Sequence, residues 1–572
     1  MEQTAQAVEG RCKELEKYWS ARNRKMKDWY RLIEMVDELK TDKMESFVGN
    51  DPRAMFNLVT HLLDAPIPHR LDIEDLGDME LANISSSVSK LLGTAWNDNA
   101  KRFRRSGPHQ SLSRYSIGLM LATGWYAEIA LLSDDGKSIY FEPLHPAQVY
   151  PMWDYEQGLS EVAHIYTISS SSAKRMCSRN NWTVEIRGLS DITIYDYWWV
   201  EYEVLGQPLI CNAVSIGGTL VKYEPTHLRR IPIYTGPVGG LPDSGILSNQ
   251  ILTSSNNVGS PADTWKAEIG QSIVATNENI YRSWNKWWTF SMQLLRDTAQ
   301  PRIFERSRSG KAIVKPEDVF RRGAIFRGGP DDSVDFIGSP PIPLELRSTQ
   351  LDLEAMMQRG GVSWAMFGNA TGQLTAYVMS QIAASANQIM RPFHQAIINK
   401  TEDEDNDILQ DILSRGASPY NWKIPEGLTS EMRVVADYDI EIPGDLIQRA
   451  TVARMIDPDF RLSYSYVLQH LFPDIKNSME ERARVRADIA ERHPTNSMIA
   501  LIQYYRIQAA FLTKNGDTES ARLYDLAADL AESQISPQQP QQTGQPNLPT
   551  NTGTPAVSPR FQLPQNASSE VM

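Results

Sequence analysis

The sequence predicts an α+β protein that is mainly helical and is divided into several parts. Three observations support this fold class. Apolar residues recur at the 3.6-residue period of a helix from Trp265 to Leu294. Short runs rich in β-branched and aromatic residues fill the stretch from Tyr126 to Tyr234. The segment from Asp445 to about Glu532 has a purely helical pattern.

A long helix is predicted at the centre of the chain, over residues 263–300. Its apolar positions share one face, and Pro301 ends it because proline cannot continue the helical hydrogen-bond ladder. These positions are Trp265, Ile269, Ile273, Ile280, Trp284, Trp287 and Leu294.

A small β-rich insert is predicted next, over residues 301–341. Runs such as Ala312-Ile313-Val314 lie between glycine, proline and aspartate turn signals there. A second helix follows over 342–358, and the glycines of 359–373 then interrupt the helical pattern. After them, Leu374 to Leu413 forms a third helix in which Pro392 should produce a kink.

Composition bounds the class of protein. The length of 572 residues fits three or four domains, and the formal net charge of −13 argues against a dedicated nucleic-acid binder. The three cysteines (Cys12, Cys177 and Cys211) have no CxxC spacing, so we expect neither a disulfide framework nor a thiolate zinc site. Without a long apolar run or a signal peptide, we expect no membrane contact and synthesis inside a cell.

The N-terminal region is predicted as one amphipathic helix from Thr4 to Leu39. Its aromatic side should pack on the body of the protein, and its basic middle is either a solvated face or a surface for nucleic acid or an acidic partner. The basic residues are Arg22, Arg24, Lys25, Lys27 and Arg31.

The strand-rich stretch from Tyr126 to Tyr234 is predicted as a mixed sheet with helices on it, because no GxGxxG opens a helix there. Hairpin turns are expected at Asp135-Gly136 and Gly217-Gly218. A further strand pair is expected from Met432 to Ile442. The tail over 534–572 is rich in Pro, Gln, Asn, Thr and Ser, so it should be disordered.

Signals for covalent chemistry are absent from the sequence. It has no Walker A, HExxH, GxSxG or kinase pattern. The acidic run Glu402 to Asp407 resembles a metal site in composition only. Consecutive helical residues point around the whole cylinder, so we expect a solvated helix face. We therefore predict no catalytic residue, no metal and no cofactor.

The order of these elements resembles the portal proteins of tailed bacteriophages, the head–tail connectors. The strongest likeness is the order of helix, β-rich insert, helix and glycine break over 265–373, followed by the kinked helix. The resemblance extends from about position 20 to 490. It also rests on Asn50-Asp51-Pro52 with Asn57-Leu58-Val59, Phe141 to Pro146, Arg230-Ile231-Pro232-Ile233, and Met455-Ile456-Asp457-Pro458 with 463–481.

The resemblance implies a portal-like division of the chain. It comprises a mixed α/β wing (1–262), a helical stem (263–300 and 342–358), a small α/β clip (301–341), a channel loop (359–373), a kinked wing helix with strands (374–443), a helical crown (444–533) and the tail (534–572).

The resemblance also implies a function without enzymatic activity. About twelve copies would form a ring at one capsid vertex of the virion, made in the host cytoplasm, through which double-stranded DNA enters and leaves without sequence-specific contact. The ring would meet the major capsid and scaffolding proteins, then the terminase large subunit, and later the tail adaptor proteins.

Candidate functional residues fall in three groups under this resemblance. Glycines would hinge a loop that narrows the channel, and the alternative that they form a fixed turn is not excluded. Aromatic residues of the stem would form subunit contacts, because large rings bury the most area. Basic residues of the clip would contact terminase, adaptors or DNA. The loop set is Gly360, Gly361, Asn369, Thr371 and Gly372; the stem set is Trp265, Ile273, Trp284, Trp287 and Trp288; the clip set is Arg302, Arg306, Arg308, Lys311, Lys315, Arg321, Arg322 and Arg327.

Three alternatives stay open at this point. The clip arginines could instead pair with acidic residues of neighbouring subunits and only hold the ring together. The whole chain could be an elongated scaffold or adaptor without a ring. A metal-dependent enzyme acting on nucleic acid, with Asp403 and Asp405 as ligands, is the third.

Overall fold

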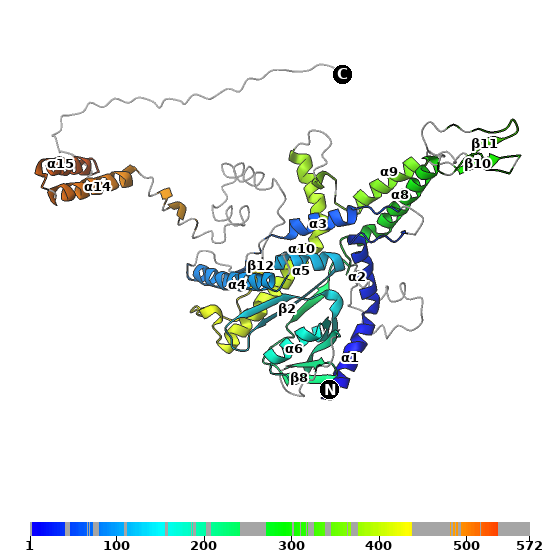
Figure 1. The fold of residues 1–572 in the computed structure, drawn as a ribbon. Helices are drawn as coiled ribbons and strands as arrows, with labels where there is room; N and C mark the ends of the chain where they lie inside the picture. Colours follow the sequence, from blue (N-terminus) through cyan, green and yellow to red (C-terminus); the bar gives the residue numbers. More distant parts are fainter. Residues whose placement is uncertain are drawn as a thin grey trace, which may run out of the picture. The chain divides into compact units, whose positions relative to one another are not determined.

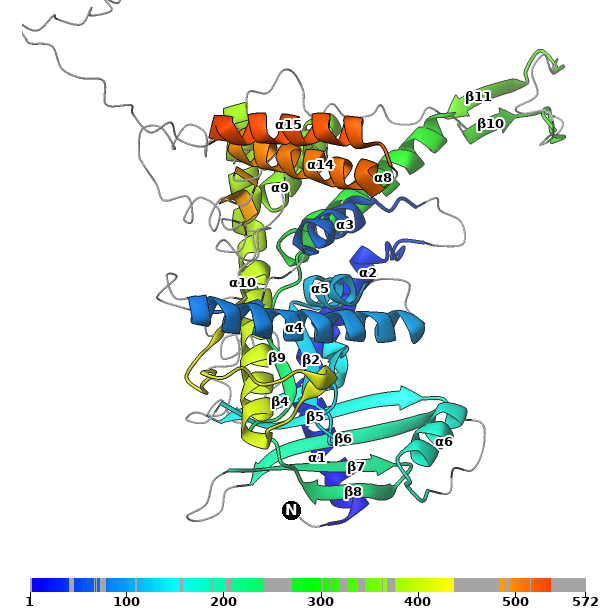
Figure 2. The ribbon, with the colours of Figure 1, turned by 90° about the vertical axis from the view of Figure 1, so that its left-hand side faces the viewer.

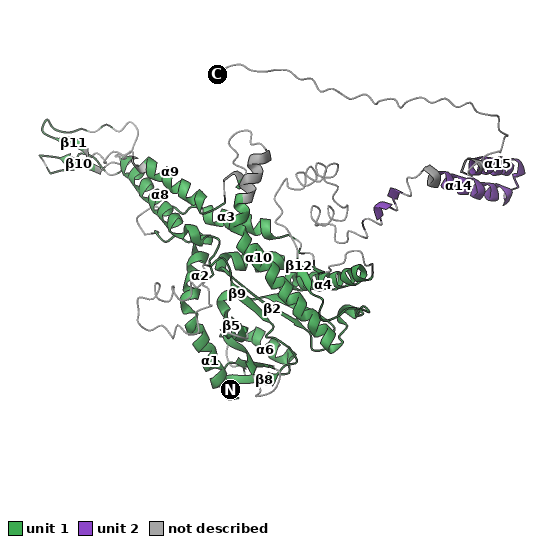
Figure 3. Ribbon diagram, turned by 180° about the vertical axis from the view of Figure 1, so that it is seen from behind, with its two compact units in different colours: residues 1–479 green, residues 480–572 purple. Residues whose placement is uncertain are grey.

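The protein consists of two compact units, residues 1–479 and 480–572 (Figure 3). The structure is a computed structural model. It describes residues 3–40, 46–65, 67, 69–72, 79–107, 111–154, 158–184, 186, 190–201, 208–240, 270–299, 302–308, 310–315, 317, 325, 327–337, 345–362, 364–367, 376–436, 481, 484–486, 488–489, 494–514 and 516–535. Helices and several antiparallel sheets confirm the predicted α+β class (Figure 1).

The N-terminal region forms two helices instead of the single predicted one. Helix α1 (Ala5–Tyr18) begins at Thr4, whose hydroxyl accepts a hydrogen bond from the Ala7 amide, and α2 (Ser20–Ile33) follows. Trp19 separates them because its ring is buried and its Nε1 donates to the Pro151 carbonyl at 2.7 Å. The aromatic side of this region therefore packs on the body, as predicted.

Two antiparallel sheets replace the predicted mixed sheet. The larger has the order β4-β5-β6-β7-β8, with its strands side by side in Figure 2. The smaller has the order β3-β2-β9. Their bounds are β2 (Trp125–Leu132), β3 (Ile139–Pro143), β4 (Val149–Asp154), β5 (Gly158–Ile168), β6 (Ile192–Glu201), β7 (Leu209–Ile216), β8 (Thr219–Pro225) and β9 (Ile233–Pro237).

Both predicted hairpin turns are present. Gly217 and Gly218, with φ of 57° and 84°, connect β7 to β8, which fits the two-residue turn that needs positive φ at both positions. Gly136 has φ of 67° in the β2–β3 turn. The predicted strand at 432–442 is shorter than expected. Strand β12 (Val434–Ala436) pairs with β1 (His69–Leu71), and residues 437–442 lie outside the described part.

Helices surround these sheets in the first unit. Helix α1 packs on the larger sheet, and α5 (Leu112–Thr123) contacts β2 of the smaller sheet. Helix α10 (Ala376–Arg415) also contacts β2, and it continues through Pro392 as one helix of 40 residues. Helices α3 (Asp51–Leu63), α4 (Met79–Arg105) and α6 (Ser170–Arg179) and the 3-10 turn η1 (Pro146–Gln148) also belong to this part of the unit.

The central stretch contains two helices joined through a β-hairpin, in the predicted order. They are α8 (Glu278–Ala299), β10 (Arg302–Arg306), β11 (Ser333–Ile337) and α9 (Glu345–Arg359). The 3-10 turns η3 (Ala275–Asn277) and η4 (Trp364–Phe367) flank the two helices, and η5 (Pro419–Asn421) follows α10.

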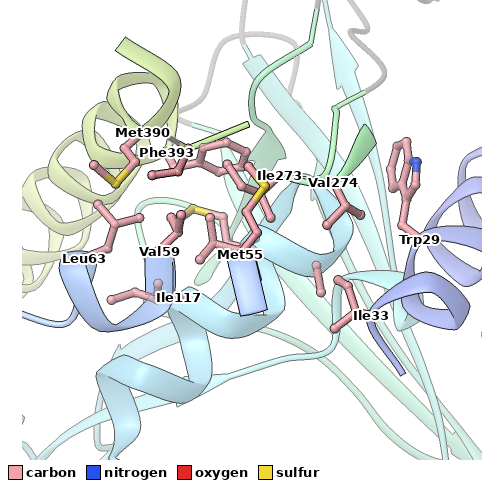
Figure 4. Close-up of a cluster of buried hydrophobic side chains, with 14 of the residues drawn as sticks. Trp29, Ile33, Met55, Val59, Leu63, Ile117, Ile273, Val274, Met390 and Phe393 are labelled. Atoms are coloured by element: carbon pink, nitrogen blue, oxygen red, sulfur yellow. The ribbon is translucent and has the colours of Figure 1, made fainter. Parts of the chain in front are cut away.

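The largest apolar core lies where α2, α3, α5, α10 and the residues before α8 meet. Figure 4 shows Met55 and Val59 of α3 directed toward Ile273 and toward Phe393 of α10. This core fixes the base of α8.

The second unit contains α14 (Pro494–Lys514) and α15 (Thr518–Ile535). Both are helical, as predicted for the crown, and α15 extends two residues beyond the predicted boundary at 533. The rest of the predicted crown, apart from residues 481, 484–486 and 488–489, and the tail from 536 lie outside the described residues.

Candidate functional site

The candidate site is the helix pair α8 and α9 with the β10–β11 hairpin at its end. The two helices contact each other, and Figures 1 and 3 show the pair extending from the rest of the first unit. Polar contacts fix its base. Glu278 accepts a hydrogen bond from Trp29 Nε1 at 3.0 Å, and Asn285 Oδ1 accepts one from the Gly49 amide at 2.8 Å. Thr289 accepts a third from the Phe47 amide at 3.0 Å. The start of α8 is therefore part of the body.

The first helix of the pair begins later than predicted. Residues 270–274 are not helical, because their backbone is bonded to the body instead: the Gln271 amide donates to Val238 O at 2.8 Å and the Ile273 amide to Leu121 O at 3.0 Å. A Cβ at Gly270 would lie 1.9 Å from the Gly124 carbonyl oxygen, so only glycine fits this approach. The prediction of one helix over 263–300 is wrong for 270–277, and residues 263–269 lie outside the described part.

The predicted stem contacts separate into different environments. Ile273 is buried in the core of its own chain, which leaves it no surface for a neighbouring subunit. Trp284 is only 8% exposed in the same core. Trp287 and Trp288 are half-buried, and their rings meet edge to face at 5.0 Å. Trp265 lies outside the described residues.

A different set of apolar residues is exposed along the pair. Phe290 is 64% exposed, and helical geometry places it on the side of α8 opposite Trp288. Leu295 of α8 is also exposed, as are Leu351 and Met356 of α9. The sequence predicted subunit contacts for most of the aromatic cluster that contains Phe290 and the tryptophans beside it, but it did not predict Leu295, Leu351 or Met356. Phe290 and Leu295 lie about 140° apart around α8, so they belong to two faces of the helix, each a candidate contact with a partner.

The two glycines after α9 serve close packing. A Cβ at Gly360 would lie 2.0 Å from Asn277 Oδ1, and one at Gly361 would lie 3.0 Å from the Met357 carbonyl oxygen. Asn277 is buried, and its Nδ2 donates to Met357 O at 2.8 Å. This contact binds the end of α9 to the start of α8. It favours the fixed-turn alternative at 360–361, whereas Asn369, Thr371 and Gly372 lie outside the described residues.

The hairpin at the far end is held by its acidic residues. Glu305 accepts hydrogen bonds from the Ile313 and Val314 amides at 3.0 and 3.1 Å. Asp332 accepts bonds from the Arg308 and Gly329 amides, which lower the pKa of its carboxyl. Arg308 Nη1 lies 2.8 Å from Asp331 Oδ2. These contacts fold the loop back on the hairpin.

The basic residues of the hairpin are exposed wherever their side chains are described: Arg306, Arg308, Lys311, Lys315 and Arg327. The side chain of Arg302 is not described, and Arg321 and Arg322 lie outside the described residues. Residues 301–330, counted from the sequence alone, have eight basic and three acidic side chains, and this excess shrinks when the hairpin is bounded by its strands. Residues 302–337 contain eight basic and six acidic side chains, because Asp331, Asp332 and Asp335 belong to the same hairpin.

The acidic run on α10 is only in part the solvated face that we expected, because Asp403 is exposed but other members are buried. Glu404 and Asp405 are fully buried. Lys400 contacts the Glu128 carboxylate and lies 3.7 Å from Glu404, while Asp405 contacts His69. Burial alone would lower the pKa of Lys400, but the charges of Glu128 and Glu404 raise it above its ordinary value. The sequence carried a signal: Glu404 continues the apolar stripe of Ile397, Ile408 and Ile412 on one helix face.

A cavity of about 730 Å³ lies beside this charged cluster, lined on one side by Lys400, Asp403 and Asp407. Arg230 Nη1 lies 3.4 Å from Asp407, and the Tyr234 hydroxyl donates to the same carboxylate at 2.9 Å. Burial and the charge of Asp407 raise the pKa of nearby Asp411 to about 6. The Asp407 carboxylate that faces the cavity is thus already engaged by Arg230 and Tyr234 of the same chain.

The basic middle of the N-terminal region is largely engaged as well. Arg22 is buried between the rings of Trp19 and Trp125, and burial lowers its pKa to about 9. Its Nη2 donates to the Val149 carbonyl at 2.8 Å. Lys25 lies 3.7 Å from Glu278. Arg22 and Lys25 therefore hold this region on the body, whereas Arg24 and Lys27 are exposed and fit either of the two alternatives.

Among the described residues, no group of three or more His, Cys, Asp or Glu side chains could hold a metal ion. Within the same residues, no helix is long and apolar enough to span a membrane.

No protein-family model and no curated protein matches the sequence. Among solved structures, the chain is similar to a chain in the neck of a native gene transfer agent (GTA) particle computed with C12 symmetry, with 13% identity, 74% of this chain and 89% of that chain covered, and a TM-score of 0.37. The neck of an empty GTA particle computed with C6 symmetry gives 14% identity, coverage of 78% and 93%, and a TM-score of 0.39. Because TM-scores this low do not define a shared fold, we infer no function from these likenesses.

Proposed function

We propose that the chain is a subunit of a portal-like ring, a head–tail connector through which a viral genome is packaged and ejected. The observation that carries the proposal is the anchored helix pair with exposed apolar faces and a basic hairpin at its end. In this arrangement α8 and α9 form the stem, the hairpin forms the clip, and the two sheets with α10 form the wing.

The exposed faces of the pair explain why neighbours are needed. Phe290 and Leu295 on α8, with Leu351 and Met356 on α9, leave apolar area in water that a second copy would cover. Contacts between different faces of identical subunits close into a ring when the rotation permits. A net negative chain repels DNA from most of a channel wall, which suits passage without tight binding.

The basic hairpin would be the docking surface. Its exposed arginines and lysines would meet an acidic surface of the packaging motor, the terminase, and later the tail adaptors. A complementary charged patch raises docking rates and fixes register, whereas isolated exposed pairs contribute only about 0–1 kcal/mol each. Six acidic residues offset most of the eight basic charges of residues 302–337. Docking would therefore depend on the individual exposed basic residues and not on the net charge of the hairpin.

The proposal predicts closed rings of the purified chain in negative-stain electron microscopy and a matching native mass. The double variant Phe290→Glu with Leu295→Glu should lose the rings and keep the circular dichroism and thermal midpoint of the wild type, because both side chains are exposed within the subunit. Elongated single particles of the wild-type chain would instead support a scaffold without a ring. Rings unaffected by the double variant would move the contact away from α8.

Charge reversal in the hairpin should separate docking from assembly. Arg306→Glu with Lys311→Glu avoids Arg308, which is paired with Asp331. We expect rings of normal mass that bind terminase at least tenfold more weakly, and wild-type binding that weakens as salt rises. The matched control reverses exposed lysines elsewhere, Lys137→Glu with Lys174→Glu, and should bind normally. Rings that dissociate, with unchanged affinity in those that remain, would assign the hairpin to assembly.

A further inference from the structure

The hairpin of α14 and α15 has its large apolar residues on the outside. The seam between the two helices is formed mostly by small residues: Ala509, Ala521, Ala528 and Ala531 are buried there with Ile502. The exposed positions include a leucine that is 69% exposed, Leu523, and an isoleucine that is 66% exposed, Ile507. A hairpin that worked alone in water would have the opposite distribution, so its outer faces need a partner.

Six of the exposed apolar residues form two stripes of equal length, whereas Ile499 and Leu501 of α14 are exposed outside the stripes. One stripe is Tyr504, Ile507 and Phe511 on α14, and the other is Leu523, Leu526 and Leu530 on α15. Both have the 3,4 spacing that places side chains along one line of a helix and is typical of helix–helix seams. The two stripes therefore have the same number of residues and the same length, and in an antiparallel contact their middle residues are offset by about 1.5 Å.

The stripes face away from each other. At about 100° per residue, the α15 stripe lies about 150° around its helix from the buried alanines, and the α14 stripe lies about 180° from Ile502 and Ala509. Each helix thus has one partner inside the hairpin and a second apolar face on its far side. A single partner bound to one side of the hairpin would cover one stripe and leave the other exposed to water.

Charge selects how copies of the hairpin pair. Helix α14 contains two basic residues, Arg506 and Lys514, and no acidic residue, whereas α15 contains four acidic residues and one arginine. Arg506 is ion-paired with Glu532 of its own hairpin, which leaves Lys514 on α14 and Glu519, Asp525 and Asp529 on α15 for contacts between copies. Contacts of α14 with α14, or of α15 with α15, bring like charges together. Contact of α15 with the α14 of another copy brings opposite charges together and places Glu519 and Lys514 at the same end.

We propose that the hairpin is a head-to-tail assembly element in which the α15 stripe of one copy packs on the α14 stripe of the next. Leu523, Leu526 and Leu530 then lie opposite Phe511, Ile507 and Tyr504 of the neighbour. Such a contact uses different surfaces on its two sides, so it repeats until it closes. The inference rests on the proposed ring only for the number of copies that assemble. The contact between copies is inferred from the exposed stripes and the charges of α14 and α15.

Cysteine cross-linking of the full chain tests this pairing. The variant Ile507→Cys with Leu526→Cys should give a ladder of covalent multimers on mild oxidation, because the two positions meet between copies and point apart within one copy. Each single variant should stay monomeric. The matched control, Ile507→Cys with Asp525→Cys, moves the second thiol to another face of α15 and should lose most of the ladder. The native cysteines Cys12, Cys177 and Cys211 are buried, which keeps the background low.

The outcomes distinguish this inference from the proposed ring. Dimers from a single variant would show pairing between like helices and would overturn it. No cross-link from the double variant, in a chain that forms rings by electron microscopy, would overturn the hairpin contact and leave the ring intact. A ladder from a chain that forms no closed ring would support the contact and contradict the ring.

Discussion

Replacing Lys400 by methionine should lower the free energy of unfolding by about 3–5 kcal/mol, the range for removing one partner of a buried ion pair. Lys400 is buried on α10, between Glu128 of β2 and Glu404 one turn further along the helix. Methionine retains the length of the side chain but leaves the Glu128 carboxylate without its cation. Urea unfolding of the purified chain, followed by circular dichroism, measures the loss.

Two further variants make this prediction specific. Adding Glu128→Gln and Glu404→Gln to Lys400→Met removes the orphaned charge and should recover at least half of the lost stability. The control Lys137→Met changes a lysine side chain that is 81% exposed and should shift stability by less than about 0.5 kcal/mol. A decrease of less than about 1 kcal/mol in the free energy of unfolding of Lys400→Met, the size typical of an exposed ion pair, would contradict the prediction and indicate that Glu128 is hydrated.

Trp284→Ala should cost the chain about 3–5 kcal/mol of its own folding free energy, the range for large aromatic residues in cores. Trp284 belongs to the cluster that contains Tyr281 and Met55, and its ring lies 6.0 Å from that of Trp287. The exposed Phe290 on the same helix is the matched comparison. Phe290→Ala should change folding stability little and reduce assembly.

Thermal unfolding and native mass spectrometry of both variants measure the two effects separately. A Trp284→Ala chain that folds as stably as the wild type but no longer assembles would restore the subunit contact that the sequence predicted for this residue.

Local patterns predicted much of the fold. Alternating β-branched and aromatic runs located β2, β3, β5, β6 and β8. Asp135-Gly136 and Gly217-Gly218 located two hairpin turns, because side-chain alternation and positive φ are local properties. The apolar spacing before α8 was misleading. Ile273 fits a helical period, but a short apolar run fits a buried extended segment equally well, and hydrogen bonds to Leu121 and Val238 decide the outcome.

Charged residues were the least predictable part of the site. Composition suggested that Glu404 and Arg22 face solvent, since such residues are rarely buried without a partner. Their partners are distant in sequence: Lys400 joins Glu404 to Glu128 of another element, and Trp125 covers Arg22. Only the tertiary fold brings these groups together.

The contact of Asn277 with Gly360 and Met357 gives α8 and α9 a common pivot. Helix α8 has 22 residues, so it extends about 33 Å from that pivot at about 1.5 Å per residue. Because Asn285 and Thr289 are hydrogen-bonded to Gly49 and Phe47 of the body, only the ten residues after Thr289, about 15 Å, extend beyond these contacts. Helix α8 connects the hairpin directly to the core, so a force applied at the hairpin is transmitted to the core residues Tyr281 and Trp284.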